Sequence, residues 1–251
     1  MSPSEHPTKT TYHLYTFYAS SCAARLRIAF NLKNLSYTPH YRDMGKKDHE
    51  SDEYRKMNPS ASIPTLVIET EGKEPFTIGQ SVAILEYLEE LHPTQTPLLP
   101  PPSDPEARSR VRELMYIVSS DIFPPTNSRI AQMVKGMRGE REDAITFVKT
   151  IMTRGFTAYE ALLSTYFPNA RYSAGEEITL ADVVLIPQVE QARFYGVNFA
   201  QWPLLNGVIT RLEELDAFKQ AGWRSQGDTP EEDRVSVTRE EERGNGLGAK
   251  A

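Results

Sequence analysis

The chain has 251 residues, of which 39% are hydrophobic and 25% charged, and its formal net charge is −6 at pH 7. This composition predicts a globular protein long enough for two modest cores, and it lacks the broad basic surface that nucleic-acid binding requires. A single cysteine excludes an intramolecular disulfide, no apolar run reaches the length of a membrane span, and residues 1–11 lack a secretory signal, so we expect a cytoplasmic protein without a membrane or nucleic-acid partner.

The first predicted elements are a strand over residues 12–18, which are rich in aromatics, and a helix in which apolar residues recur at helical spacing over residues 26–30. Ser20, Ser21 and Cys22 therefore lie at a strand-to-helix turn. Unpaired N–H groups and the helix dipole favour an anion there, such as a thiolate or a carboxylate. The alternative is structural, with a serine as the N-cap and the cysteine as a small buried residue.

A second strand is predicted over residues 36–41, which completes a βαβ unit. The polar segment 42–56 is expected to form a solvated loop or a short surface helix. Only Lys46 and His49 in this segment are candidates for contact with a ligand.

Pro64 precedes an apolar run that is typical of a third strand. If the Ile63–Pro64 bond is cis, the backbone of Ile63 faces outward and can pair with an extended ligand. A short strand over residues 76–78 and a helix that begins at Gln80 and Ser81 then give a ββα unit. Ser81 is expected to be the N-cap, able with the free N–H groups to hold a carboxylate, while Gln80 can accept from an ammonium group.

Six prolines between His92 and Pro105 exclude a helix or a central strand and predict a domain boundary. The sequence thus predicts an N-terminal domain over residues 11–92, a linker over 93–105 and an all-helical domain over 106–225. Its helices are expected over residues 106–122, 140–167, 180–194 and 204–218. Residues 226–251 carry many charges and no apolar periodicity, which predicts a disordered tail.

Thr179 and Asp182 have the spacing of a capping box, in which each side chain accepts from the backbone N–H of the other residue. Ile178 and Val183 can add a hydrophobic staple at the same helix start. We therefore interpret Asp182 as a structural residue rather than a catalytic acid. No metal site is predicted.

These features together resemble the cytosolic glutathione transferases, which have a thioredoxin-like α/β N-terminal domain (βαβ–ββα) followed by an all-α C-terminal domain. The run Ser20-Ser21-Cys22, followed by Arg25-Leu26-Arg27-Ile28-Ala29, resembles their zeta class, the maleylacetoacetate isomerases. Further matches are Asn58-Pro59, Ile63-Pro64-Thr65-Leu66, Gln80-Ser81, Thr179-Leu180-Ala181-Asp182, Pro187-Gln188-Val189 and Asp228-Thr229-Pro230.

The resemblance implies glutathione as the cofactor and a role for each matched residue in the N-terminal domain. Ser20 would donate to the glutathione sulfur and favour its thiolate, and Ser21 and Cys22 would line the same turn. The backbone of Ile63 would pair with the cysteinyl part of glutathione. The γ-glutamyl end would be held by Gln80 and Ser81, and the expected glutathione-binding set also includes Arg25 and His49.

For the second substrate, the resemblance implies a pocket among the apolar helices, with Arg193 and Asn127 as substrate-binding residues. Arg25 and Arg193 are cations that could offset the charges of a dicarboxylate. The chain departs from the zeta pattern at Ser62 and Phe123, where glutamine is common. An ungapped count also places Phe194, not Arg193, at the position of the family's substrate-carboxylate arginine.

The predicted function is the glutathione-dependent isomerisation of maleylacetoacetate to fumarylacetoacetate, a step of phenylalanine and tyrosine catabolism. The resemblance also implies a homodimer, in keeping with helix faces that carry more apolar positions than a monomer needs. A general glutathione transferase or peroxidase and a non-catalytic binding module stay as alternatives. A glutaredoxin-like protein is a further alternative, although Arg25 replaces the second cysteine of a Cys-x-x-Cys motif.

Overall fold

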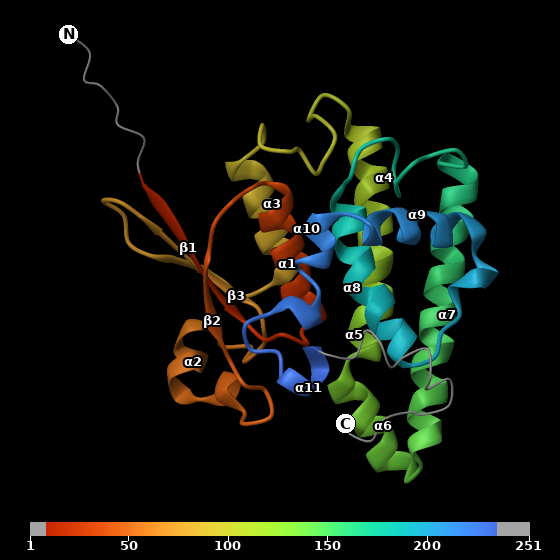
Figure 1. Cartoon of the computed structure of the whole chain (residues 1–251), viewed down its shortest axis with the longest axis horizontal. Helices are drawn as coiled ribbons and strands as arrows, with labels where there is room; N and C mark the ends of the chain where they lie inside the picture. Colours follow the sequence, from red (N-terminus) through yellow and green to blue (C-terminus); the bar gives the residue numbers. More distant parts are fainter. Residues whose placement is uncertain (1–8, 235–251) are drawn as a thin grey trace.

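The computed structural model describes residues 9–234. Its N-terminal part is built on a four-stranded sheet, and Figure 1 shows this sheet beside the helices of the C-terminal part. The strands are β1 (Thr10–Thr16), β2 (Thr38–Tyr41), β3 (Thr65–Thr70) and β4 (Phe76–Ile78), in the order β2-β1-β3-β4. β2 is parallel to β1, whereas β3 and β4 are antiparallel to their neighbours. With α1 (Ser21–Leu32), α2 (Asp52–Met57) and α3 (Ser81–Leu91), this sheet confirms the predicted thioredoxin-like βαβ–ββα unit.

Local details of this unit differ from the prediction. The first strand begins and ends two residues earlier than predicted, and the polar segment holds a 3₁₀ turn (Asp48–Glu50) before α2. Ser81 is not the N-cap of α3, because Gln80 has the extended backbone of a cap and Ser81 is the first helical residue. The Ile63–Pro64 bond is cis.

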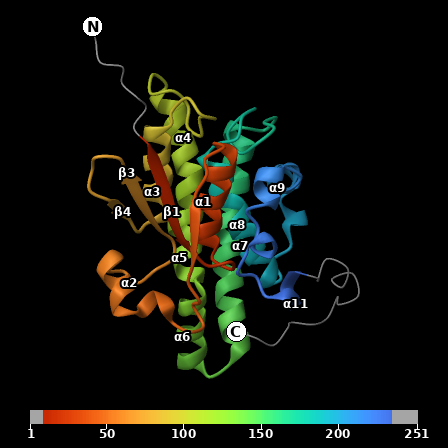
Figure 2. The ribbon, with the colours of Figure 1, turned by 60° about the vertical axis from the view of Figure 1, so that its left-hand side comes forward.

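The C-terminal part is all-helical (Figure 2). It is arranged around α8 (Leu180–Phe194), in which most side chains are buried. Its other helices are α4 (Pro105–Tyr116), α5 (Phe123–Thr126), α6 (Ser128–Arg138), α7 (Arg141–Tyr166), α9 (Pro203–Glu213), α10 (Asp216–Lys219) and α11 (Glu231–Arg234). α1 packs against α8, so one core runs from the sheet into the helical part. The predicted capping box at the start of α8 is confirmed, with the Thr179 N–H 2.8 Å from Asp182 Oδ2.

The predicted helix over residues 106–122 ends in a π-helical turn, Ile117–Ile122. Pro124 and Pro125 follow this turn and lack the N–H groups that would continue an α-helical ladder, and the Phe123 N–H bonds instead to Val118 O. Gly155 of α7 faces the turn, and a Cβ there would lie 2.2 Å from Ile122 Cγ1. The glycine therefore allows α7 and the π-helical turn to approach closely. The prediction missed α6, and it merged α9 with α10.

The proline-rich segment between the two parts is anchored by a buried ion pair. Lys33 Nζ, at the C-cap of α1, lies 2.8 Å from Glu89 Oε2 of α3, and both side chains are almost fully enclosed. The Glu89 carboxylate accepts from the N–H groups of Leu98 and Leu99, and Leu98 O accepts from the N–H of Leu180 at the start of α8. The same pair therefore fixes the linker to both α3 and α8.

The first residues of the predicted tail are folded, so the prediction of disorder was wrong for residues 226–234. After α10, the chain forms a 3₁₀ turn (Trp223–Ser225) and reaches α11, and the side chains of Gln226 and Thr229 are buried. The apolar pattern of the sequence gave no sign of this fold, because the segment packs through hydrogen bonds to backbone carbonyls rather than through an apolar face. Residues 235–251 lie outside the described part. Within residues 9–234, no helix is both long and apolar enough to cross a membrane.

Candidate active site

The turn between β1 and α1 presents a serine hydroxyl at a helix N-terminus. Ser20 is the N-cap of α1, and its Oγ accepts from the Ala23 N–H at 3.2 Å. This bond uses an oxygen lone pair and leaves the O–H free to donate to a ligand. The structural alternative and the anion-site interpretation are therefore compatible, since the cap holds the hydroxyl where α1 favours negative charge.

Ser21 and Cys22 are the first two residues of α1, and both are partly exposed beside Ser20. The Cys22 thiol is free. Among the described residues, no group of three or more His, Cys, Asp or Glu side chains could hold a metal ion.

Arg25, one turn into α1, connects this turn to the start of α3. Its side chain is only 2% exposed, and its Nη1 donates to Ser81 Oγ at 3.3 Å. The Arg25 guanidinium also lies 4.9 Å from the centre of the Phe123 ring, just after the π-helical turn. Its Nε and Nη2 have no hydrogen-bond partner among the described residues.

A buried, incompletely paired guanidinium is costly unless negative charge lies nearby. Because the Nε and Nη2 atoms of Arg25 are enclosed, this side chain could act on a ligand only through Ser81 and through its electrostatic field, not by direct contact. The N-termini of α1 and α3 add to the same field. This junction is therefore suited to a ligand that carries a carboxylate and a thiolate.

Asn58 fastens the loop before the cis bond to the start of β3 and lies close to Gly79, just before α3. Its Nδ2 donates to Ser62 O at 2.9 Å and to Thr65 Oγ1 at 2.8 Å. A Cβ on Gly79 would lie within 3 Å of the Asn58 amide, so only glycine permits this contact.

The Ile63 side chain is buried beside Ala23 and Tyr54, which places residue 63 next to the first turn of α1. Its N–H and C=O have no partner among the described residues, so both are available to an extended ligand. Gln80 is exposed, and its side chain makes no capping bond. Its amide is therefore also available.

His49 is not connected to this cluster by any interaction found in residues 9–234. Its Nε2 lies 3.8 Å from Glu50 Oε1, and its Nδ1 is enclosed without a partner in that range. The other candidate of the same polar segment, Lys46, is exposed and pairs with Asp43 at 3.2 Å. The geometry gives neither residue a place beside Ser20.

The two predicted substrate-binding residues are engaged elsewhere. Arg193, in the last turn of α8, forms a bidentate pair with Glu213 of α9. Its charge is thereby compensated, and a substrate carboxylate would have to compete with Glu213. Asn127 is the N-cap of α6, and its Oδ1 accepts from the Arg129 N–H at 3.0 Å.

Two residues that hold the Ser20 turn, Arg27 and Asp228, lie in the matched motifs, but the sequence assigned them no role. Arg27 is fully buried and donates to the carbonyls of Phe17 and Tyr18, and Asp228 accepts from the Tyr18 N–H. A charged residue inside the apolar run that opens α1 was the available signal for Arg27. Only the long-range packing reveals Asp228.

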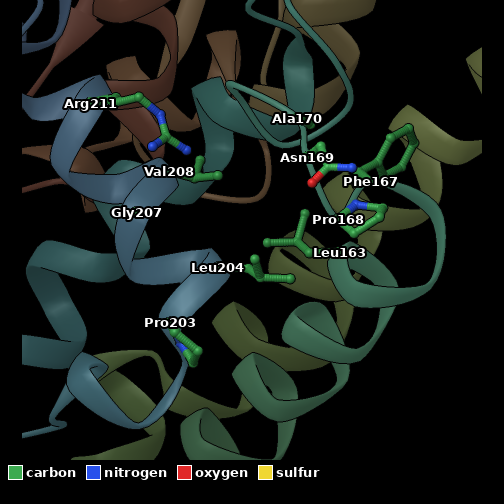
Figure 3. A pocket seen from close by; sticks show the side chains of 10 residues that line it. All are labelled: Leu163, Phe167, Pro168, Asn169, Ala170, Pro203, Leu204, Gly207, Val208 and Arg211. Carbon is green, nitrogen blue, oxygen red and sulfur yellow. The ribbon is translucent and has the colours of Figure 1, made fainter.

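A separate hollow of about 260 Å³ lies between the end of α7 and α9 (Figure 3). It is lined mainly by apolar side chains, with Arg211 at its edge. None of the predicted site residues lines it. The candidate active site is therefore recognised by its converging polar groups and helix N-termini rather than by the volume of a cavity.

Comparison with known proteins gives consistent matches over most of the chain. Residues 14–99 match the model of the N-terminal domain of glutathione S-transferases, and residues 123–216 match that of the C-terminal domain. The maleylacetoacetate isomerase maiA of Aspergillus fumigatus is 46% identical over 233 residues, which are 92% of this chain and 99% of the relative.

Two solved structures are similar over nearly their whole length. One is a holo maleylpyruvate isomerase, described as a bacterial zeta-class glutathione S-transferase. It is 39% identical with a TM-score of 0.78, and the match covers 87% of this chain and all of that one. The other is a maleylacetoacetate isomerase of Anaeromyxobacter dehalogenans with glutathione bound in its active site. It is 32% identical with a TM-score of 0.79, over 89% of this chain and all of that one.

Proposed function

The chain belongs to the zeta class of glutathione transferases, the family of the maleylacetoacetate isomerases, and we propose that it isomerises a cis-enedioyl acid such as maleylacetoacetate with glutathione as cofactor. The observation that carries this proposal is the Arg25–Ser81 bond, which brings the N-termini of α1 and α3 together beside Ser20. This arrangement offers a hydroxyl donor and a positive field to a ligand with both a thiol and a carboxylate.

The residues present fit glutathione along its length. Gln80 and Ser81, with the positive end of α3 and Arg25 behind them, would hold the γ-glutamyl end, since the buried guanidinium lacks a full set of partners. The unpaired N–H and C=O of Ile63 would bond to the cysteinyl part. The thiol would then lie at the Ser20 turn.

Bound glutathione would supply a thiolate that adds to the cis double bond of the substrate, lets the resulting single bond rotate and is released unchanged. Ser20 would donate its O–H to the glutathione sulfur and stabilise the ionised thiol, as the positive end of α1 would also do. Ser21 and Cys22 line the same turn and position the reacting groups. Cys22 has no role as a nucleophile in this scheme.

A second candidate function is glutathione conjugation to apolar electrophiles. The Arg193–Glu213 pair and the Phe123 ring beside Arg25 favour it, because they leave the second-substrate side less cationic than a dicarboxylate requires. In this reading, Arg193 and Asn127 have structural roles. His49, with no connection to the cluster among the described residues, is retained only as a peripheral glutathione contact.

One assay separates the two functions. The purified protein is given maleylacetoacetate or maleylpyruvate with a small amount of glutathione, and both substrate and free thiol are followed. Isomerisation converts many equivalents of substrate without consuming thiol. Conjugation consumes one thiol per turnover, and a protein that binds glutathione without either reaction is a binding module.

We further propose that the protein is a homodimer and that it works in the cytoplasm. Apolar side chains on neighbouring elements are exposed, namely Phe76 of β4, Leu91 of α3 and Tyr116 of α4. An Arg112–Glu86 bond of 3.0 Å joins α4 to α3, the two helices that carry Tyr116 and Leu91, and exposed apolar side chains of this kind are typical of subunit interfaces. Light scattering that gives twice 28.4 kDa supports this proposal, and a monomer mass at micromolar concentration contradicts it.

A further inference from the structure

The turn that carries Ser20 is held by two charged side chains rather than by the sheet. Phe17 O accepts from the Ser20 N–H at 3.1 Å and from Arg27 Nη1 at 3.3 Å. Both backbone polar groups of Tyr18 are bound, since its N–H donates to Asp228 Oδ2 at 2.9 Å and its carbonyl oxygen accepts from Arg27 Nη2 at 3.1 Å. β1 has already ended at Thr16, so these bonds set the path of the chain into Ser20.

Arg27 connects this turn to the C-terminal segment, which we define as residues 216–234. Its side chain is 1% exposed, and its Nε donates to Ala221 O at 2.8 Å. Burial lowers the pKa of Arg27 to about 10, so the guanidinium stays charged at neutral pH. A buried cation is stable only when its donors are paired, and the C-terminal segment supplies one of the acceptors.

Asp228 is presented to the turn by its own packed loop. Gln226 Nε2 donates to Gln220 O at 3.0 Å and to Gly222 O at 2.8 Å, which closes that loop. Gly227 lies against β2, where a Cβ would be 2.4 Å from Tyr41 Oη. These contacts of Gln226 and Gly227 therefore position the Asp228 carboxylate independently of its bond to Tyr18.

Among the described residues, the Tyr18 N–H is the one hydrogen-bond donor to the Asp228 carboxylate, whose Oδ1 is enclosed without a partner. Folding stability alone does not favour such a group, since an enclosed carboxylate oxygen without a donor costs free energy. The arrangement makes sense if the carboxylate orients the turn.

We propose that Asp228 is a positioning residue for Ser20, and that the C-terminal segment is thereby part of the glutathione-activating machinery. Asp228 holds the Tyr18 amide, Arg27 holds the two carbonyls beside it, and the Ser20 hydroxyl is thus fixed at the N-terminus of α1. The inference rests on the proposed role of Ser20 in activating glutathione. It adds a residue more than 200 positions away in the sequence to that site.

The test compares Asp228→Ala, Asp228→Asn and Gln226→Ala. Asp228→Ala removes the acceptor, whereas Asp228→Asn keeps an oxygen that can accept from the Tyr18 N–H. Gln226→Ala loosens the same loop without touching Tyr18 and is the matched structural control. Glu231→Ala, an exposed carboxylate on α11, controls for charge alone.

Three readouts are expected to move together in Asp228→Ala. Hydrogen exchange of the Tyr18 amide, measured without glutathione, becomes at least tenfold faster. The thiolate absorbance of bound glutathione near neutral pH falls about tenfold, because the pKa of the bound thiol rises by about one. kcat falls between about tenfold and a hundredfold while KM for glutathione changes little, because the turn is misplaced rather than the γ-glutamyl contacts.

Asp228→Asn should keep the exchange rate of the Tyr18 amide, the thiolate absorbance and kcat close to those of the wild type. Gln226→Ala should lower the melting temperature without reducing the thiolate absorbance. If Tyr18 exchange is unchanged in Asp228→Ala, or if Gln226→Ala and Asp228→Ala lose thiolate equally, Asp228 is merely structural and the proposal is wrong. Failure of the proposed function is distinguishable, because the wild type would then lack isomerase activity while the exchange measurement still reports on the turn.

Discussion

Replacement of Ser20 separates the two roles that the structure assigns to one hydroxyl. As the N-cap of α1, Ser20 accepts from the Ala23 N–H, and Ser20→Ala should cost about 1 kcal/mol of unfolding free energy. As the proposed donor to the glutathione sulfur, it should contribute more to catalysis. Loss of one charge-stabilising donor typically lowers kcat by about 10²–10³-fold.

Ser20→Gly distinguishes these contributions. Glycine is nearly as good an N-cap as serine and restores all but a few tenths of a kcal/mol, but it has no donor. We therefore expect Ser20→Ala and Ser20→Gly to differ in thermal stability and to be equally impaired in kcat. Ser20→Thr, which keeps a hydroxyl, should retain stability and much of the activity.

The assay combines thermal unfolding with steady-state kinetics and the ultraviolet absorbance of bound thiolate. Cys22→Ala is the matched control, since it changes the neighbouring residue of the same turn and removes no necessary donor. Its glutathione activation should survive. If Cys22→Ala is inactive while Ser20→Gly is nearly normal, the reaction uses a protein thiol and the reasoning about Ser20 is refuted.

Three further predictions concern buried residues. Gly155→Ala should lower the unfolding free energy by about 1–3 kcal/mol in denaturant titrations, because the added methyl group overlaps Ile122. The double variant Gly155→Ala/Ile122→Ala should lose less stability than the sum of the two single variants. Additive losses would show that the two residues are not in contact. Burial raises the pKa of Glu190 from 4.5 to about 7, so the folded state binds the proton more tightly and stability should fall by roughly 3 kcal/mol as pH rises from 4.5 to above 7. Glu190→Gln should flatten that dependence, and an unchanged pH profile would refute the assignment. Lys33→Met leaves Glu89 as an uncompensated buried charge and should cost about 3–5 kcal/mol in the same titrations, whereas a neutral effect would show that the pair does not anchor the linker.

The local patterns of the N-terminal part were sufficient to predict its elements. A run rich in aromatics predicted β1, apolar residues at helical spacing predicted α1, and proline before an apolar run predicted the start of β3. The capping box at Thr179 and Asp182 was also readable, because both partners lie within one helical turn.

What the sequence could not predict depends on distant partners. The π-helical turn arises where Pro124 and Pro125 meet the close approach of Gly155, and α6 presents little buried apolar surface, with Ala131 as its one buried residue in the structure. The folded start of the tail includes Asp228, whose partner Tyr18 is 210 residues away in the sequence. No local pattern contains such a pair.

At the site, the sequence identified the Ser20 turn and the start of α3, but not how they are joined. The Arg25–Ser81 bond joins residues that are 56 positions apart in the sequence, so the N-termini of α1 and α3 act on the same site electrostatically. Conversely, the expectation for Arg193 came from the family resemblance, against an ungapped count that favoured Phe194, and in the structure Glu213 already compensates the charge of Arg193.

The central claim is that this chain uses glutathione as a catalyst for isomerisation. The most direct test is to follow the double-bond geometry of maleylacetoacetate by NMR while titrating free thiol, with glutathione at one hundredth of the substrate concentration. We expect complete conversion from the cis to the trans isomer, strict dependence on glutathione and no loss of thiol. Conversion that stops when one thiol has been consumed per substrate, or that proceeds equally without glutathione, would contradict the claim.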